Sequence, residues 1–162
     1  MKVDGRLLLK FIATAHRNTY AATTKVKKQH KCEVPILPKH RDYEFFEGDF
    51  SYYDSYAGSI WAPGREVVFF KRTPVWAMAY QGKSSLAHSQ HFFENAVFPF
   101  LKEALRNSTD DMPFRGPVEF SDGDFQYTFE INGDYSYFTG KETITYIGEV
   151  VFSQDVMGSL IK

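Results

Sequence analysis

The sequence contains a single cysteine, Cys32, in 162 residues, and it has no long hydrophobic run. One cysteine excludes an intramolecular disulfide, so the packing of a core must stabilise the fold. No apolar stretch approaches the roughly 20 residues of a membrane-spanning helix, and no charged and apolar regions of a secretory signal are evident. We therefore expect a cytoplasmic protein without a membrane partner. The length fits one domain covering residues 1–162.

Common catalytic patterns are also missing. The chain has no GxSxG nucleophile elbow, no phosphate-binding P-loop, no HExxH motif and no dinucleotide-binding glycine pattern. His88 and His91 lie near Ser84 and Ser85, but no carboxylate or third ligand accompanies them. We therefore predict no catalytic residues, no metal site and no cofactor.

Aromatic residues, by contrast, are abundant. They make up 17% of the chain, with ten Tyr and sixteen Phe. Aromatic side chains favour strands over helices. The composition therefore predicts a sheet-rich fold.

The chain also repeats itself. Residues 44–52 (EFFEGDFSY) recur as residues 119–127 (EFSDGDFQY), with identical residues at six of nine positions. Upstream of each copy, residues 11–19 (FIATAHRNT) match residues 100–108 (FLKEALRNS) at Phe, Ala, Arg and Asn. A repeated unit of a helix followed by strands predicts two pseudo-symmetric repeats, at about 5–86 and 88–162.

Periodicity places the elements of each repeat. Helical stripes of apolar residues cover residues 6–20 and 89–107, and Pro99 should kink or break the second helix. Strands are expected over residues 50–56, 59–70, 75–80, 125–131, 134–146 and 150–156. Asn132-Gly133 predicts a two-residue hairpin turn, aligned with Ala57-Gly58. The fold class is therefore α+β: a duplicated helix plus three-stranded antiparallel meander, with the helices on one side of a combined antiparallel sheet.

Charge is unevenly distributed. Residues 1–42 carry a net charge of +7 and residues 43–162 a net charge of −8. The basic excess centres on TKVKKQHK, residues 24–31, within a long loop expected at about 21–42. This loop is either a solvated, flexible segment or a contact for phosphate or an acidic protein partner. A basic cluster without a docked helix or stacking platform does not favour nucleic acid.

Several segments resemble a known family. They are residues 52–58 (YYDSYAG), 64–68 (GREVV), 74–80 (PVWAMAY), 100–105 (FLKEAL) and 114–117 (FRGP). Through them nearly the whole chain is similar to DUF5680, a bacterial and archaeal family of unknown function. Family members also occur C-terminal to helix-turn-helix domains, so the resemblance implies a sensing or effector role. The family offers no established catalytic residues, and the Lys-rich segment departs from its pattern.

Differences between the repeats indicate where a site was added. Asp54 replaces Phe129 on a strand face that it shares with Tyr52 and Tyr56. A carboxylate on an aromatic face must be hydrogen-bonded or paired, or its pKa rises. Asp54 is therefore a structural residue satisfied by a hydroxyl or turn amides, a ligand-binding residue, or an acid/base.

The first repeat is also the more aromatic one. Trp76 and Tyr80 align with Phe152 and Val156, and Trp61 adds another ring. Such rings form either an ordinary core or a pocket in which polar tips orient a ligand. Charged candidates are Glu66, and Arg115, which could pair with Glu44 or Asp54 or clamp an anion. The predicted ligand-binding residues are Tyr52, Asp54, Tyr56, Trp61, Glu66, Trp76, Tyr80 and Arg115.

Three hypotheses follow from these residues. The first is a noncatalytic domain that binds or senses an unknown small molecule in an aromatic-lined pocket. The second is a regulatory module that contacts a protein through the basic loop and a sheet edge. The third is a small enzyme in which Asp54 or Glu66 acts as acid/base. A homodimer is consistent with exposed sheet edges, by analogy only.

Overall fold

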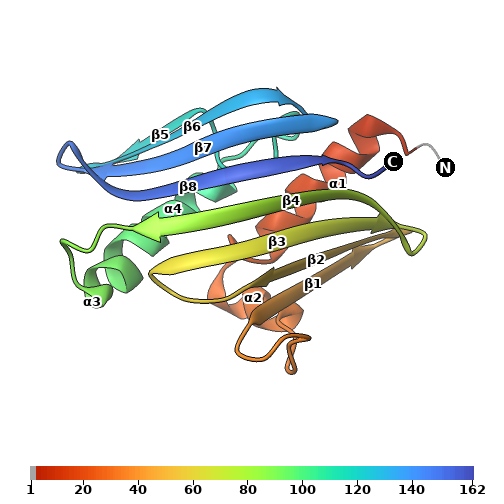
Figure 1. Ribbon diagram of the computed structural model, residues 1–162, viewed down its shortest axis with the longest axis horizontal. Coiled ribbons are helices and arrows are strands. Elements are labelled where there is room, and N and C mark those ends of the chain that lie inside the picture. Colours follow the sequence, from red (N-terminus) through yellow and green to blue (C-terminus); the bar gives the residue numbers. More distant parts are fainter. Residues whose placement is uncertain (1–2) are drawn as a thin grey trace.

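The computed structural model describes residues 3–162 and contains one eight-stranded antiparallel sheet (Figure 1). The strands lie in the order β1-β2-β3-β4-β8-β7-β6-β5. Their bounds are Arg41–Glu47 (β1), Phe50–Tyr56 (β2), Trp61–Phe70 (β3), Thr73–Ser84 (β4), Glu119–Asp122 (β5), Phe125–Asp134 (β6), Tyr137–Tyr146 (β7) and Glu149–Leu160 (β8). The predicted α+β class with an antiparallel sheet is confirmed.

Each half of the sheet has four strands, so the prediction of three-stranded meanders is wrong. The additional strands are β1 and β5, which lie at the two edges. Each pairs with the next strand through a tight turn, at Gly48 (φ +58°) and Gly123 (φ +56°). Neither edge strand alternates regularly between buried and exposed residues, so the period of two does not reveal them.

β4 and β8 join the two halves into one continuous sheet. They pair antiparallel from Trp76↔Leu160 to Ser84↔Phe152. The strands far apart in the sequence are therefore neighbours at the centre, and the first and fifth strands are at the edges.

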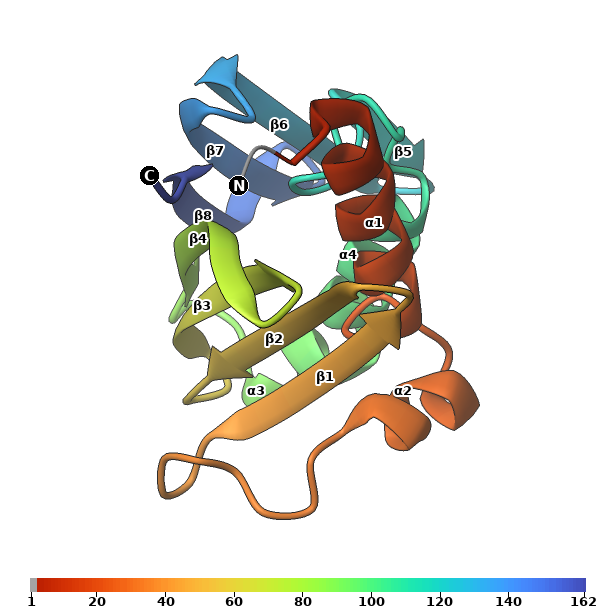
Figure 2. The ribbon, with the colours of Figure 1, turned by 90° about the vertical axis from the view of Figure 1, so that its right-hand side faces the viewer.

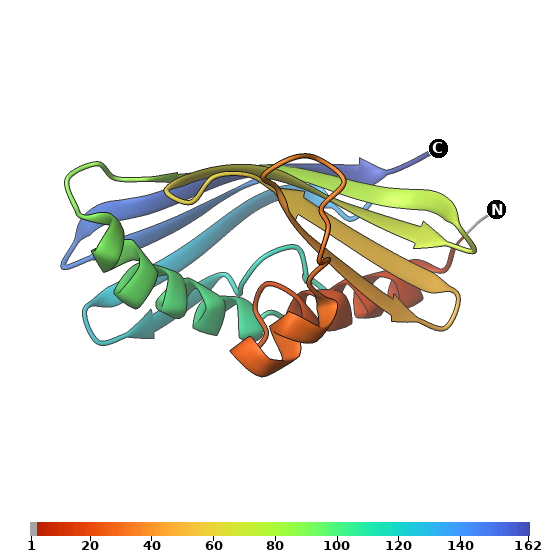
Figure 3. The same ribbon diagram turned by 90° about the horizontal axis from the view of Figure 1, so that it is seen from below.

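The helices lie on one face of the sheet (Figure 3). α1 (Gly5–Asn18) begins after Asp4, whose side chain accepts hydrogen bonds from the backbone N–H groups of Arg6 and Leu7. The second predicted helix comprises α3 (Gln90–Phe92), a π-helical turn (Phe93–Val97) and α4 (Phe98–Arg106). The π-helical turn directly precedes Pro99, so a local change in winding accommodates the proline.

The segment at residues 21–42, expected to be a loop, contains α2 (Thr24–His30). None of the residues of α2 is fully buried, and the helix has no apolar stripe. A side view places α2 beside β1, with α1 and α4 on the same side of the twisted sheet (Figure 2). A short polar helix has no hydrophobic period, which explains why the sequence pattern does not indicate it.

The predicted turn at Asn132-Gly133 is also wrong. The chain reverses at Tyr135-Ser136, because Asp134 pairs with Tyr137. The Asp134 carboxylate accepts hydrogen bonds from both the backbone N–H and the hydroxyl of Ser136, which holds this turn. Gly133 does have a positive φ of 104°, but it lies within β6.

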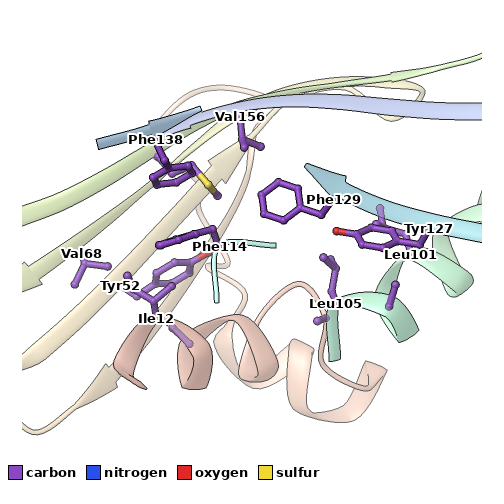
Figure 4. Packing of buried hydrophobic residues seen from close by; sticks show 14 of the residues in the cluster. Ile12, Tyr52, Val68, Leu101, Leu105, Phe114, Tyr127, Phe129, Phe138 and Val156 are labelled. Carbon is purple, nitrogen blue, oxygen red and sulfur yellow. The ribbon is translucent and has the colours of Figure 1, made fainter. Parts of the chain in front are cut away.

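An aromatic core fills the space between the sheet and the helices (Figure 4). Phe114, which precedes β5, stacks on Phe138 of β7 with ring centroids 4.3 Å apart. Trp76 of β4 stacks on both rings and is fully buried. The stack therefore ties the two halves together at the seam between β4 and β8.

Candidate functional site

A cavity of about 230 Å³ lies between the first half of the sheet and the helices. β2, β3 and β4 contribute Asp54, Glu66 and Tyr80 to its wall. Further lining residues come from α2, α4, β1, β2, β8 and the segments between elements: Tyr20, Lys27, Arg41, Tyr56, Phe98, Leu101, Lys102, Arg115, Phe152 and Gln154. The cavity therefore combines aromatic walls with charged groups of both signs.

Asp54 is the central acidic group of this wall. Its side chain faces the helices because alternate residues of β2 are buried, and the residue is only 2% exposed. The Tyr80 hydroxyl donates a hydrogen bond to Asp54 Oδ1 at 2.6 Å. Burial, and then the charge of Glu66, raise the pKa of Asp54 to about 7. Asp54 therefore changes its protonation state near neutral pH.

Glu66 lies directly across from Asp54, on β3. Its Oε2 forms a hydrogen bond of 2.6 Å with Nε2 of His16, a residue of α1. Both side chains are buried, and Glu66 is 3% exposed. Hydrogen bonding by the His16 ring offsets part of the cost of burying the Glu66 carboxylate.

Arg115, also in the cavity wall, forms a buried ion pair with Glu142. Its Nε and Nη2 donate to the two carboxylate oxygens of Glu142 at 3.1 and 2.9 Å, a bidentate geometry. Tyr127 and Gln154 donate to the same carboxylate at 2.7 and 3.2 Å. The predicted pairing of Arg115 with Glu44 or Asp54 is therefore wrong.

Two lysines of the cavity wall, Lys27 and Lys102, lie against the ring of Tyr20. The ammonium groups of Lys27 and Lys102 lie 4.4 and 5.5 Å from the centroid of the Tyr20 ring. Burial, and then repulsion from Lys102, lower the pKa of Lys27 to about 7. Burial, and then the charge of Arg106, also lower the pKa of Lys102. Neither lysine has a carboxylate oxygen within 4.0 Å among residues 3–162.

Five of the eight predicted site residues line the cavity together: Asp54, Tyr56, Glu66, Tyr80 and Arg115. Three predicted residues lie outside it. Tyr52 and Trp76 are buried in the core, and Trp61 is 48% exposed, with its Nε1 donating to the carbonyl of Ser84. The expectation that all the rings of the first half line one pocket is therefore corrected: aromatic content does not distinguish a core ring from a cavity ring.

Several residues of the site were not predicted. They are His16, Tyr20, Lys27, Lys102, Glu142 and Gln154. A signal exists for Glu142: the repeat alignment that pairs Gly64 with Gly140 also pairs Glu66 with Glu142. Gln154 lies on β8. His16, Tyr20, Lys27 and Lys102 lie on helices or in a segment between elements, where the sequence does not say which side meets the sheet.

Within residues 3–162 no group of three or more His, Cys, Asp or Glu side chains is arranged to hold a metal ion. Over the same residues, no helix has both the length and the apolar character needed to cross a membrane.

Comparison with known proteins found one family match, which covers most of the chain. The family model for a domain of unknown function, DUF5680, matches residues 54–161. The match begins at Asp54 and includes Glu66, Tyr80, Arg115 and Glu142. No curated protein matches the chain.

Proposed function

We propose that this chain, which belongs to the DUF5680 family of unknown function, is a noncatalytic domain that binds a small molecule in its cavity. One observation carries the proposal: a buried carboxylate, Asp54, lines a cavity of about 230 Å³. Burying a carboxylate without a compensating role destabilises a fold, so such groups concentrate at binding and catalytic sites.

The polar ends that face the cavity support this function. Among the described residues, the side chain of Asp54 is hydrogen-bonded only at Oδ1, and that of Glu66 only at Oε2. Within the same part of the chain, the Arg115 side chain donates only from Nε and Nη2. The second carboxylate oxygens and Arg115 Nη1 are therefore available to a ligand. Because each group is already fixed by one partner, it can orient a ligand with little loss of side-chain entropy.

Native mass spectrometry of protein purified gently from cells tests this proposal. The wild type should carry a noncovalent mass increment that is lost on denaturation. Asp54→Asn should lack the increment while remaining folded, because Asn cannot supply a carboxylate to the ligand. Asp155→Asn is the matched control, since Asp155 is an exposed residue of β8 outside the cavity. An increment that survives in Asp54→Asn would show that the Asp54 carboxylate is not needed for binding, which contradicts the proposed role of Asp54 in a binding domain.

A second candidate function is acid/base catalysis. It is favoured by the cross-strand pair of Asp54 and Glu66 and by the pKa of Asp54 of about 7. A carboxyl group with that pKa can give or take a proton at neutral pH. In an enzyme, Asp54→Asn would still bind the extracted compound but would no longer convert it, whereas in a binder the wild type would leave the compound unchanged.

We also infer that the two halves arose by internal duplication. The support lies in repeated local features: the paired repeats of sequence, and positive φ angles at Gly58 (+86°) and Gly133 (+104°). A register shift follows Val68 in β3 and Ile144 in β7, two residues after Glu66 and Glu142. On this view the cavity formed in the half where Asp54 occupies the position that Phe129 fills in the other.

A further inference from the structure

A basic groove runs outward from the cavity. It is a hollow of about 560 Å³ that shares Lys27 and Lys102 with the cavity. Its lining has five cationic side chains and no carboxylate: Lys27, Lys28, Lys31, Lys102 and Arg106. Thr23, Thr24 and Tyr43 add hydroxyl groups. The groove is thus a concentrated positive surface that adjoins the candidate site at Lys27 and Lys102.

Two helices set the positions of these cations. α2 supplies Lys27 and Lys28, and α4 supplies Lys102 and Arg106. Arg106 Nη1 donates to the carbonyl of Ala21 at 2.8 Å, and the guanidinium also pairs with Glu103. Arg106 therefore ties α4 to the segment that leads into α2, and holds the two sides of the groove together.

The groove contains charge that the protein itself does not neutralise. Lys27 and Lys102 face the same Tyr20 ring, and Lys27 also lies 4.8 Å from the centroid of the Tyr43 ring. No carboxylate oxygen of the described chain lies within 4.0 Å of Lys27, Lys28, Lys31 or Lys102. Cations held close together in this way repel one another, and a bound anion would remove that repulsion.

We propose that the basic groove binds the phosphate group of a phosphate monoester whose organic part enters the cavity. A phosphate dianion fits several ammonium groups on different sides, because lysines act as point charges without a fixed planar geometry. The aromatic walls and the Asp54 carboxyl would then bind a neutral part that donates hydrogen bonds. This inference rests on the proposed function, since it names the class of ligand for the same cavity.

Titration with inorganic phosphate, followed by amide NMR at constant ionic strength, tests the groove directly. We expect saturable shifts confined to the amides around α2 and α4. Lys27→Gln and Lys102→Gln should each weaken phosphate binding by about tenfold, because each removes one charge-assisted contact. Lys25→Gln is the matched control: Lys25 is an exposed lysine of α2 outside the groove, so its loss should have little effect. Shifts that do not saturate, or an equal loss in Lys25→Gln, would overturn the proposal.

Phosphorus NMR of the compound released from the cell-purified protein separates this inference from the proposed function. A compound that contains phosphate, and that is lost in both Asp54→Asn and Lys102→Gln, supports both. A compound without phosphorus that is lost only in Asp54→Asn overturns the phosphate inference and leaves the binding function intact. Saturable phosphate binding without any retained compound in the cavity would count against the function but not against the groove.

Discussion

Glu66 and Glu142 occupy corresponding places in the two halves of the sheet, and each is hydrogen-bonded by a different part of the chain. Glu66 faces Asp54 across the strands and bonds to His16 of α1, whereas Glu142 faces Phe129 and bonds to Arg115. Two acidic groups therefore lie close together in the first half, and a single acid paired with a guanidinium lies in the second. This difference gives the first half its titratable site.

Removing the charge of Glu142 should strongly destabilise the protein. Glu142→Gln leaves the buried Arg115 guanidinium without a counter-charge, which should lower the free energy of unfolding by about 3 kcal/mol. Urea unfolding measures the change. A double variant, Arg115→Met with Glu142→Met, should recover part of the loss, because no unpaired charge then remains buried. If the double variant were much less stable than Glu142→Gln, the charge would not be the cause.

The stability contribution of Asp54 should depend on pH. The folded carboxyl holds its proton up to about pH 7, whereas the unfolded one loses it near its ordinary pKa of 3.8. The folded state therefore binds more protons between these values, and the Asp54 contribution to the free energy of unfolding falls as pH rises from 4 to 7. At pH 8 the free energy of unfolding of Asp54→Asn should exceed that of the wild type by at least about 1 kcal/mol. This difference should vanish near pH 4. Urea unfolding at both pH values checks this, and a difference independent of pH would contradict it.

The Tyr80 hydroxyl should lower the pKa of Asp54 by donating to its carboxylate. Tyr80→Phe removes that donor, so the pKa of Asp54 should rise above its wild-type value. Carbon NMR of the Asp54 carboxyl group during a pH titration measures the change. The variant should also lose about 1 kcal/mol of stability through the missing hydrogen bond. Tyr137→Phe is the control, because Tyr137 is largely exposed, and an unchanged Asp54 titration in Tyr80→Phe would contradict the assignment.

The stability contribution of Lys27 should depend on pH in the opposite direction to that of Asp54. The pKa of Lys27 is lowered from its ordinary value of 10.5 to about 7 in the folded protein. Folding therefore releases a proton at pH values between 7 and 10.5. The cost of the buried charge is full below pH 7 and disappears as pH rises towards 10. The relevant neighbours are Lys102, Asp54, Arg41 and Lys31.

Lys27→Met tests this directly, since Met keeps an apolar stem against the Tyr20 and Tyr43 rings without the charge. The variant should be more stable than the wild type at pH 6, and the gain should shrink by pH 10. Thermal unfolding across this range provides the measurement, with Lys25→Met as the exposed control. A gain that grows with pH would contradict the assigned pKa direction.

The sequence predicted the part of the wall that β2, β3 and β4 contribute, but not the residues that the helices contribute. Asp54, Glu66 and Tyr80 could be placed because a strand alternates between two faces, and because the repeat shows where one half differs from the other. Lys27 and Lys102 could not be placed, because their position depends on how α2 and α4 dock. His16 interrupts an apolar helical stripe, which resembles an ordinary core histidine until its partner Glu66 is known.

The seam between β4 and β8 gives the cavity a role in holding the domain together. β4 contributes Tyr80 to the cavity wall, and β8 contributes Phe152 and Gln154 from the other half. A bound molecule would contact both halves at once and stabilise their junction. Ligand binding should therefore slow amide hydrogen exchange along both β4 and β8. Binding would in this way make the whole sheet more rigid.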